Sequence, residues 1–218
     1  MLVYGGLRRF VTRRGRTVDG MPRPPRPLIA GGVYHVFNRG VVRLPIFLDT
    51  RDRVGFLDGV GDVVERGSWK CLAYCLMGNH FHLLVETPEP DLDRGMQRLQ
   101  GLYARNFNRR YEREGHLFHR RYGANALTDD DLIRHIARYI VQNPVAARLC
   151  RRPGDWPWSS HRATLGHVRP PTFLAAESLL RLFGGQSDYR DFVDPGRLRR
   201  PPSPGLARGP ASAPRRST

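Results

Sequence analysis

Residues 76–87 read Leu76-Met77-Gly78-Asn79-His80-Phe81-His82-Leu83-Leu84-Val85-Glu86-Thr87. This pattern predicts a hairpin turn at Gly78-Asn79 followed by a strand, because Gly and Asn tolerate the backbone angles of tight turns. Successive side chains of a strand point to opposite faces, so His80 and His82 share one face while the apolar residues between them enter a core. Two neighbouring imidazoles can hold one divalent metal and leave room for a third protein ligand.

The segments on either side of this stretch predict the fold class. Strands are expected at 31–40, 69–77 and 123–127, in addition to the histidine strand, and helices at 51–65, 92–110 and 129–143. Thr128 can cap the last of these helices, and Pro144 is expected to end it. The order strand, helix, strand, strand, helix, strand favours an α+β fold of the ferredoxin-like type, in which helices cover a mostly antiparallel sheet.

Basic charge is concentrated at the two ends of the chain. Of the formal net charge of +16, residues 1–27 and 196–218 carry +12, which leaves +4 for residues 28–195. Both ends are rich in Pro, Gly and Arg, as disordered segments are, although basic arms can also add salt-dependent affinity for phosphates. Lys70 is the only lysine beside 35 arginines, so coding composition can also account for part of this bias.

Cysteine content and hydropathy bear on the compartment and the domain plan. Three cysteines give no even disulfide framework, and neither a long apolar run nor the pattern of a signal peptide is present. We therefore expect a cytoplasmic protein, associated with the nucleoid if it binds DNA, without a membrane partner. The expected divisions are a basic tail at 1–27, a main domain at 28–166, a helical extension at 167–195 and a basic tail at 196–218.

The predicted helix at 129–143 carries the residues that can complete a site. Tyr139 and Asn143 are four residues apart and therefore lie on the same helix face, away from the apolar stripe. The Asn143 amide oxygen is a possible metal ligand, and a tyrosine hydroxyl becomes a useful nucleophile beside a metal or a base. A half-buried tyrosine and a helix-ending asparagine are equally compatible with this pattern, so the residue types alone leave both interpretations open.

Three alternatives remain at this level. Tyr103, on the predicted helix at 92–110, is a rival nucleophile, although its spacing fits the core face of that helix. The same helix has a basic face that can contact phosphate or be simply solvated; its residues are Arg94, Arg98, Arg105, Arg109 and Arg110. Two cysteines could join the histidines in a zinc site, although their spacing fits no usual zinc motif; the four residues are Cys71, Cys75, His80 and His82.

Five sequence blocks occur in a fixed order along the chain. They are Tyr34-His35-Val36-Phe37-Asn38-Arg39-Gly40, Cys75-Leu76-Met77-Gly78-Asn79-His80-Phe81-His82-Leu83-Leu84, Gly115-His116-Leu117-Phe118, Arg138-Tyr139-Ile140-Val141-Gln142-Asn143-Pro144-Val145 and Asp155-Trp156-Pro157-Trp158-Ser159-Ser160. With these blocks the chain resembles the single-tyrosine HUH transposases, in particular the REP-associated tyrosine transposases of bacteria. The resemblance spans about residues 21–166 and implies a ferredoxin-like HUH domain.

The resemblance also implies a site and a reaction. It makes His80, His82 and Asn143 the ligands of Mg²⁺ or Mn²⁺, and Tyr139 the nucleophile. Where mobile-element relatives have Gln, this chain has Asn143. The tyrosine of such enzymes attacks single-stranded DNA beside a hairpin and leaves a 5′-phosphotyrosine and a free 3′-OH.

The implied partner is single-stranded DNA with a hairpin, such as a repetitive extragenic palindrome, bound by a monomer or a homodimer. Three arginines in or near the blocks are predicted to contact DNA: Arg39, Arg120 and Arg121. His35 and His116 lie in matching blocks without an assigned role. A catalytically silent protein that only binds DNA hairpins is the alternative from another functional class.

Overall fold

One four-stranded antiparallel sheet forms the centre of the computed structural model, which describes residues 28–194. Its strands are β1 (Gly32–Arg39), β2 (Lys70–Leu76), β3 (His80–Thr87) and β4 (Gly123–Leu127), in the spatial order β2-β3-β1-β4. Helices connect β1 to β2 and β3 to β4. This connectivity is that of a ferredoxin-like fold, so the α+β prediction is confirmed.

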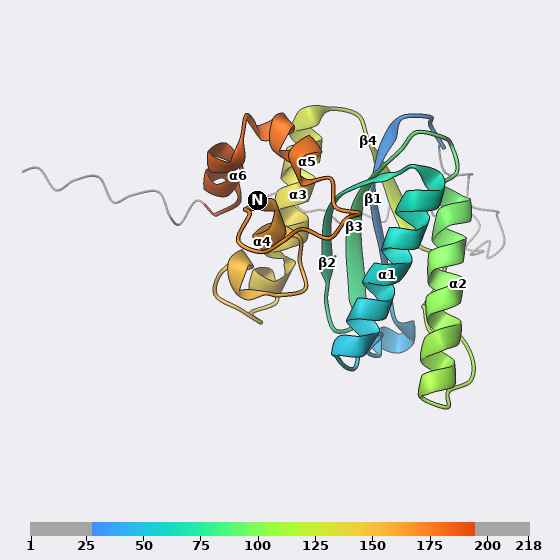
Figure 1. The fold of residues 1–218 in the computed structure, drawn as a ribbon. Coiled ribbons are helices and arrows are strands. Elements are labelled where there is room, and N and C mark those ends of the chain that lie inside the picture. The colour runs from blue at the N-terminus through green and yellow to red at the C-terminus, as the bar shows by residue number, and fades with distance from the viewer. Residues whose placement is uncertain (1–27, 195–218) are drawn as a thin grey trace, which may run out of the picture.

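Helices cover both faces of the sheet. Helices α1 (Thr50–Gly67) and α2 (Leu92–Arg110) lie side by side on one face, and α3 (Asp130–Ala146) lies on the other (Figure 1). The alternation of β3 separates the two cores as predicted, because Phe81 and Leu83 join the core of α1 and α2 whereas Leu84 joins that of α3. His80 and His82 therefore lie on the α3 face of the sheet.

The chain after α3 enlarges the second core. Helices α5 (Ala176–Phe183) and α6 (Gln186–Val193) contribute buried side chains to the same cluster as α3, after the short helices η2 (Pro153–Asp155) and α4 (His161–Thr164). The segment before α4 covers the edge of β2, where Leu76 donates its backbone N–H to Trp158 and accepts from the Trp156 indole. This covering satisfies backbone groups of an edge strand.

The ends of α3 differ from the prediction. Asp129, not Thr128, caps the helix, since its Oδ1 accepts from the Leu132 N–H at 2.8 Å. Pro144 does not end the helix, which continues to Ala146. Proline removes one backbone donor, but in the last turn the loss is limited, and the Ala147 N–H still reaches the Asn143 carbonyl at 2.9 Å.

The predicted hairpin between β2 and β3 is present, with the Met77 N–H donating to the His80 carbonyl at 2.9 Å. Neither Gly78 nor Asn79 takes a positive φ, so the expected reason for this pair was wrong. Asn79 instead uses its side chain, which bonds the His80 ring and the Arg43 carbonyl. The short helix η1 (Val41–Arg43) supplies that carbonyl.

The predicted disorder of the two basic tails concerns residues outside those that the structure describes. Within residues 28–194, no helix has the length and apolar character that crossing a membrane would require.

Candidate active site

Three histidines meet on the α3 face of the sheet. His80 and His82 project from β3 with ring centroids 5.3 Å apart, and His35 projects from the neighbouring strand β1. His35 Nε2 lies 2.9 Å from His82 Nδ1, a hydrogen bond between two buried rings. The sheet thus places three imidazoles in one layer, where the sequence had indicated a pair.

Tyr139 and Asn143 approach this layer from α3. The Tyr139 side chain is 51% exposed, yet its ring meets the His82 and His35 rings edge-on, at centroid distances of 5.5 and 5.8 Å. Asn143 Nδ2 donates to the Tyr139 carbonyl at 2.9 Å, which leaves the amide oxygen for other partners. The Asn143 side chain also lies close enough to His80 to affect the pKa of its ring. The helix spacing therefore brings both predicted residues to the histidines.

An open pocket of about 450 Å³ connects these groups to the surface. Its lining includes the predicted site residues and several basic side chains: His80, His82, Tyr139, Asn143, Arg39, Arg43 and Arg120. Arg39 stands directly across from His80 in the β1–β3 register, and Arg120 comes from the loop before β4. Arg121 and His116 are exposed but do not line this pocket. Two of the three arginines predicted to contact DNA thus border the site.

All three histidines are held in the neutral form. Burial lowers the pKa of His35 to about 4 and that of His82 well below its ordinary value, with the charges of neighbouring histidines adding to the effect on His82. Burial also lowers the pKa of His80, while the nearby Asn143 side chain opposes the shift and Arg39 adds to it. Neutral imidazole is the metal-binding form of histidine, so no proton has to be displaced near neutral pH.

Tyr103 lies away from this site. It is buried in the core of α1 and α2, on the other side of the sheet, and its hydroxyl donates to the Ile46 carbonyl. Burial raises the pKa of this hydroxyl well above its ordinary value. A buried hydroxyl that is already hydrogen-bonded cannot reach a DNA backbone, so the structure favours Tyr139 over Tyr103.

The alternative zinc site is wrong. Cys71 belongs to the core of α1 and α2, whereas Cys75 belongs to the core of α3, so the sheet separates their side chains. A bulge between Cys71 and Ala73 produces this difference in facing. Among residues 28–194, no three side chains of the types His, Cys, Asp and Glu form a group that could hold a metal. A site built on His80 and His82 therefore needs a ligand of another type, such as the Asn143 amide.

His35 and Asn79 contact the predicted ligands, although neither was expected to take part in the site. Asn79 Oδ1 lies 2.7 Å from His80 Nδ1. The alternation of side chains along the first strand could have suggested that His35 belongs to the site, because it puts His35 on the same face as Arg39. The strand register, which the sequence does not give, was needed to bring it beside His82.

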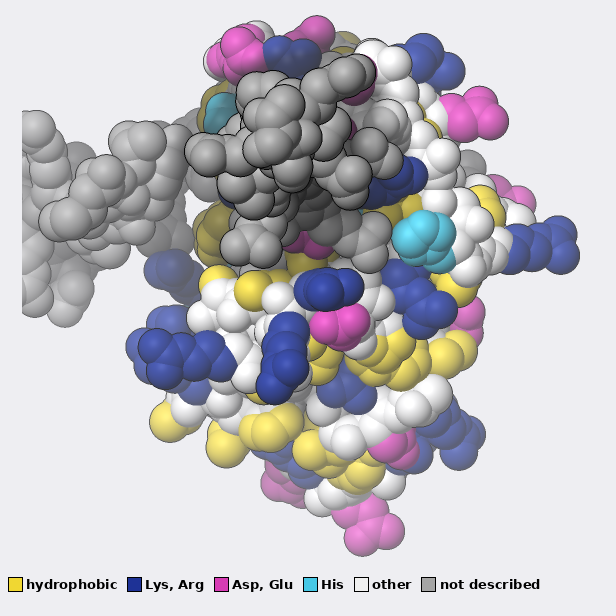
Figure 2. Space-filling view, turned by 90° about the vertical axis from the view of Figure 1, so that its left-hand side faces the viewer, with side chains coloured by type: hydrophobic (Ala, Val, Ile, Leu, Met, Phe, Trp, Pro, Cys, Tyr) yellow, Lys and Arg dark blue, Asp and Glu magenta, His cyan; other side chains and the backbone are white. Residues whose placement is uncertain are grey.

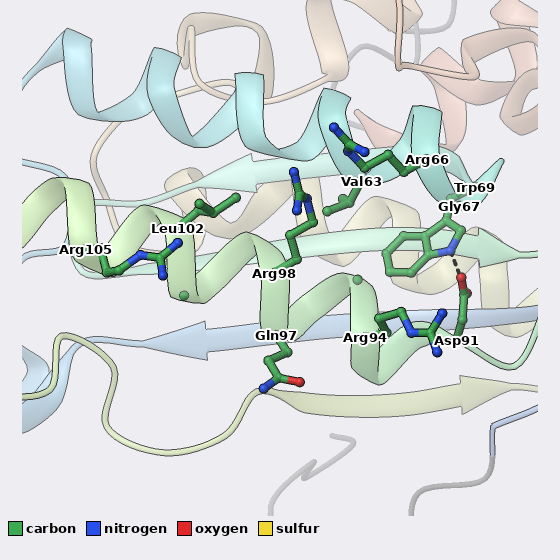
Figure 3. A pocket seen from close by; sticks show the side chains of 12 residues that line it. Val63, Arg66, Gly67, Trp69, Asp91, Arg94, Gln97, Arg98, Leu102 and Arg105 are labelled. Atoms are coloured by element: carbon green, nitrogen blue, oxygen red, sulfur yellow. Dashed lines mark hydrogen bonds between the residues drawn. The ribbon is translucent and has the colours of Figure 1, made fainter.

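A second group of arginines borders a groove of about 770 Å³ between α1 and α2 (Figure 3). Its basic residues are Arg66, Arg94, Arg98 and Arg105. Asp62 pairs with both Arg66 and Arg98, at 2.7 and 2.6 Å, which neutralises part of this charge. The groove lies across the sheet from the histidines, and none of its arginines lines the pocket at Tyr139.

The face on the side of α4, α5 and α6 is mixed in character. Figure 2 shows Lys and Arg side chains there dispersed among hydrophobic and acidic ones, outside the part that grey atoms cover. The visible part of this face therefore shows no continuous basic surface of the kind that tracks a nucleic acid backbone.

A ferredoxin-like sheet with a His-x-His pair on one strand, and a tyrosine presented by a helix across that strand, places the chain among the single-tyrosine HUH transposases. Comparison with known proteins agrees. The model of the family described as "Transposase IS200 like" matches residues 31–143, and the chain belongs to that family.

Two relatives narrow the assignment. A protein of Haemophilus influenzae named as a REP-associated tyrosine transposase is 31% identical over 119 residues, which cover 49% of this chain and 67% of the relative. A solved REP-associated tyrosine transposase, described as bound to a REP hairpin, superposes with a TM-score of 0.59 at 20% identity, over 71% of this chain and 92% of the other. The solved structure supports the fold, and the Haemophilus influenzae relative supports the assignment to the REP-associated branch.

Proposed function

We propose that this chain is a metal-dependent single-stranded DNA endonuclease and strand transferase that acts at hairpins through a 5′-phosphotyrosine intermediate. One observation carries the proposal: the exposed Tyr139 stands edge-on to His82, one helical turn before an asparagine that lines the same pocket as His80. A nucleophile, two neutral imidazoles and an amide oxygen are thereby available at one pocket. The hairpin substrate is proposed from the solved relative, which is described as bound to a REP hairpin.

The donor set fits a divalent cation. Each histidine of the pair has its Nδ1 engaged by a protein group, which leaves both Nε2 atoms as the available donors. The hydrogen bond from Asn143 Nδ2 to the Tyr139 carbonyl leaves the amide oxygen as the third donor. Mg²⁺ or Mn²⁺ bound to His80, His82 and Asn143 would polarise the scissile phosphate and stabilise charge on its oxygens.

The chain's own groups perform the transfer. The Tyr139 hydroxyl oxygen gives up its proton and attacks phosphorus, and the bond from phosphorus to the 3′ oxygen breaks. The 3′ oxygen takes up one proton and leaves as a hydroxyl, so the step is neutral in protons overall. The phosphate ester is kept in the link to Tyr139, so rejoining by a second 3′-OH needs no ATP. Arg39 and Arg120 line the pocket and would contact phosphates of a strand bound there.

The decisive experiment is a test for the covalent adduct. The protein is incubated with Mg²⁺ or Mn²⁺ and single-stranded hairpins from its own genome, and the products are separated under denaturing conditions. The proposal expects a tyrosine-linked adduct and a free 3′-OH end. Tight hairpin binding without any adduct would instead identify the silent hairpin-binding protein.

Arg39 and Arg120, at the pocket, should contribute more to hairpin affinity than arginines on the other side of the sheet. Changing Arg39 and Arg120 to Ala together is expected to weaken hairpin binding and to reduce the slope of log affinity against log salt by roughly 1.4, since each phosphate contact on a single strand contributes about 0.7. Fluorescence anisotropy over a salt series measures both quantities. Changing Arg94 and Arg105 to Ala is the matched control, because it removes equal charge across the sheet. Equal losses in the two double variants would refute the placement.

The two basic tails should add DNA affinity that does not depend on the sequence of the DNA. Deleting residues 1–20 and 197–218 removes much of the +12 charge of the two ends. We expect weaker binding to every DNA and a flatter salt dependence, with the preferred hairpin unchanged. Competition between hairpins before and after the deletion provides the measurement, and an unchanged salt slope would show that the tails are passive.

A further inference from the structure

In each of the two candidate metal ligands, the Nδ1 atom is held by another protein side chain. His80 Nδ1 lies 2.7 Å from Asn79 Oδ1, and His82 Nδ1 lies 2.9 Å from His35 Nε2. Neither Asn79 nor His35 is itself a candidate ligand. A hydrogen bond to the second nitrogen of a histidine determines which nitrogen carries the proton and how the ring is oriented.

The proton on His80 follows from the partners of Asn79. Asn79 Nδ2 donates to the Arg43 carbonyl at 2.9 Å, so the amide nitrogen is committed and the oxygen faces His80. An amide oxygen only accepts, and His80 Nδ1 must therefore donate. A neutral imidazole has one protonated nitrogen, so the lone pair of His80 is then on Nε2.

The proton on His82 follows from the position of His35. Two neutral rings share one proton between His82 Nδ1 and His35 Nε2, and the short separation leaves no space for a cation at either nitrogen. If His82 is a ligand, it can bind only through Nε2, so its Nδ1 must be protonated and His35 must accept. The opposite arrangement would put the proton on the Nε2 of His82 and block that ligand.

We propose that His35 and Asn79 are positioning residues that hold His82 and His80 as Nδ1–H tautomers, so that both Nε2 atoms are ready to bind one divalent cation. This inference rests on the proposed metal site, and it adds the groups that prepare the site before metal arrives. His35 is buried on β1 and Asn79 lies in the β2–β3 turn, so the sheet and its hairpin each contribute one such group.

Asn79 also ties the site to a strained turn. Val42 and Arg43 both take positive φ values, 49° and 61°, which a β-branched residue such as Val42 rarely adopts. The Asn79 amide holds the carbonyl at the end of this turn, and Arg43 lines the pocket. The same side chain therefore orients His80 and fixes the backbone that presents a basic residue to the substrate.

The tautomers can be read without metal and without DNA. Long-range ¹H–¹⁵N spectra of the full chain labelled with ¹⁵N-histidine distinguish Nδ1–H from Nε2–H rings, and the His35→Phe and Asn79→Ala proteins assign the signals. The inference expects both His80 and His82 as Nδ1–H tautomers and His35 with an unprotonated Nε2. A protonated Nε2 on His82 or on His80 overturns it.

Metal affinity provides the second measurement. His35→Phe keeps a ring beside Tyr139 but offers no acceptor, whereas His35→Gln offers an amide oxygen at a similar reach. Losing an outer partner of a metal-bound histidine typically weakens affinity by about 10- to 100-fold. We expect His35→Phe to weaken Mn²⁺ binding by that factor, measured by the electron paramagnetic resonance signal of free Mn²⁺, and His35→Gln to restore most of it.

Two outcomes separate this inference from the proposed function. If the wild-type chain binds Mn²⁺ and a folded His35→Phe protein binds it equally well, the positioning role of His35 is wrong while the metal site stands. If the wild-type chain binds no Mn²⁺, the metal proposal fails, and the tautomer spectra still decide how the rings are held. Asn79→Ala, in a half-buried turn, tests the same role at His80 should His35→Phe fail to fold.

Discussion

Replacing Tyr139 with Phe is expected to abolish the covalent protein–DNA adduct completely. The change removes a single oxygen from a side chain that is half exposed, and the ring that meets His82 and His35 edge-on remains. Folding, metal binding and hairpin affinity should therefore persist while the transfer step disappears. Denaturing electrophoresis of the protein with a labelled hairpin measures the adduct, and a thermal melt confirms the fold.

Tyr103→Phe is the matched control, and it is expected to keep the adduct that Tyr139→Phe loses. Its hydroxyl donates to the buried Ile46 carbonyl, so Tyr103→Phe should lower the free energy of unfolding by about 1 kcal/mol and leave adduct formation largely intact. An adduct that survives in Tyr139→Phe and is lost in Tyr103→Phe would show that the active helix is α2 and that α3 has another role.

The features that the sequence predicted are those that depend on local periodicity. Alternation along β3 placed His80 and His82 on one face, and the helical repeat placed Tyr139 and Asn143 together on α3. Both patterns are properties of a single element. For this reason they could be derived before the arrangement of the elements in space was known.

The features that were missed depend on how elements meet. His35 reaches His82 only because β1 pairs with β3 in one particular register, and the different facing of Cys71 and Cys75 results from a bulge in β2. Even the turn at Asn79 is explained by its side-chain partners, one of which is the carbonyl of Arg43, 36 residues earlier in the chain. Contacts between distant segments therefore define the surroundings of the candidate ligands.

Removing the metal should have an effect as large as removing the nucleophile. With EDTA present, cleavage and adduct formation are expected to stop, and added Mg²⁺ or Mn²⁺ should restore both. Hairpin binding should change little, because it depends on phosphate and base contacts elsewhere. Full activity in EDTA would refute the metal proposal.

His80→Ala is the cleaner substitution for testing the ligand set. Removing the His82 ring would also leave the buried His35 without its partner, and an unpaired buried polar group lowers stability by itself. His80 is less buried, so its loss should abolish cleavage and weaken Mn²⁺ binding with little effect on the thermal melt. His167→Ala, at an exposed position, is the control for the loss of one histidine. Cleavage by His80→Ala at the rate of His167→Ala would show that the pair on β3 is structural and that Tyr139 acts without it.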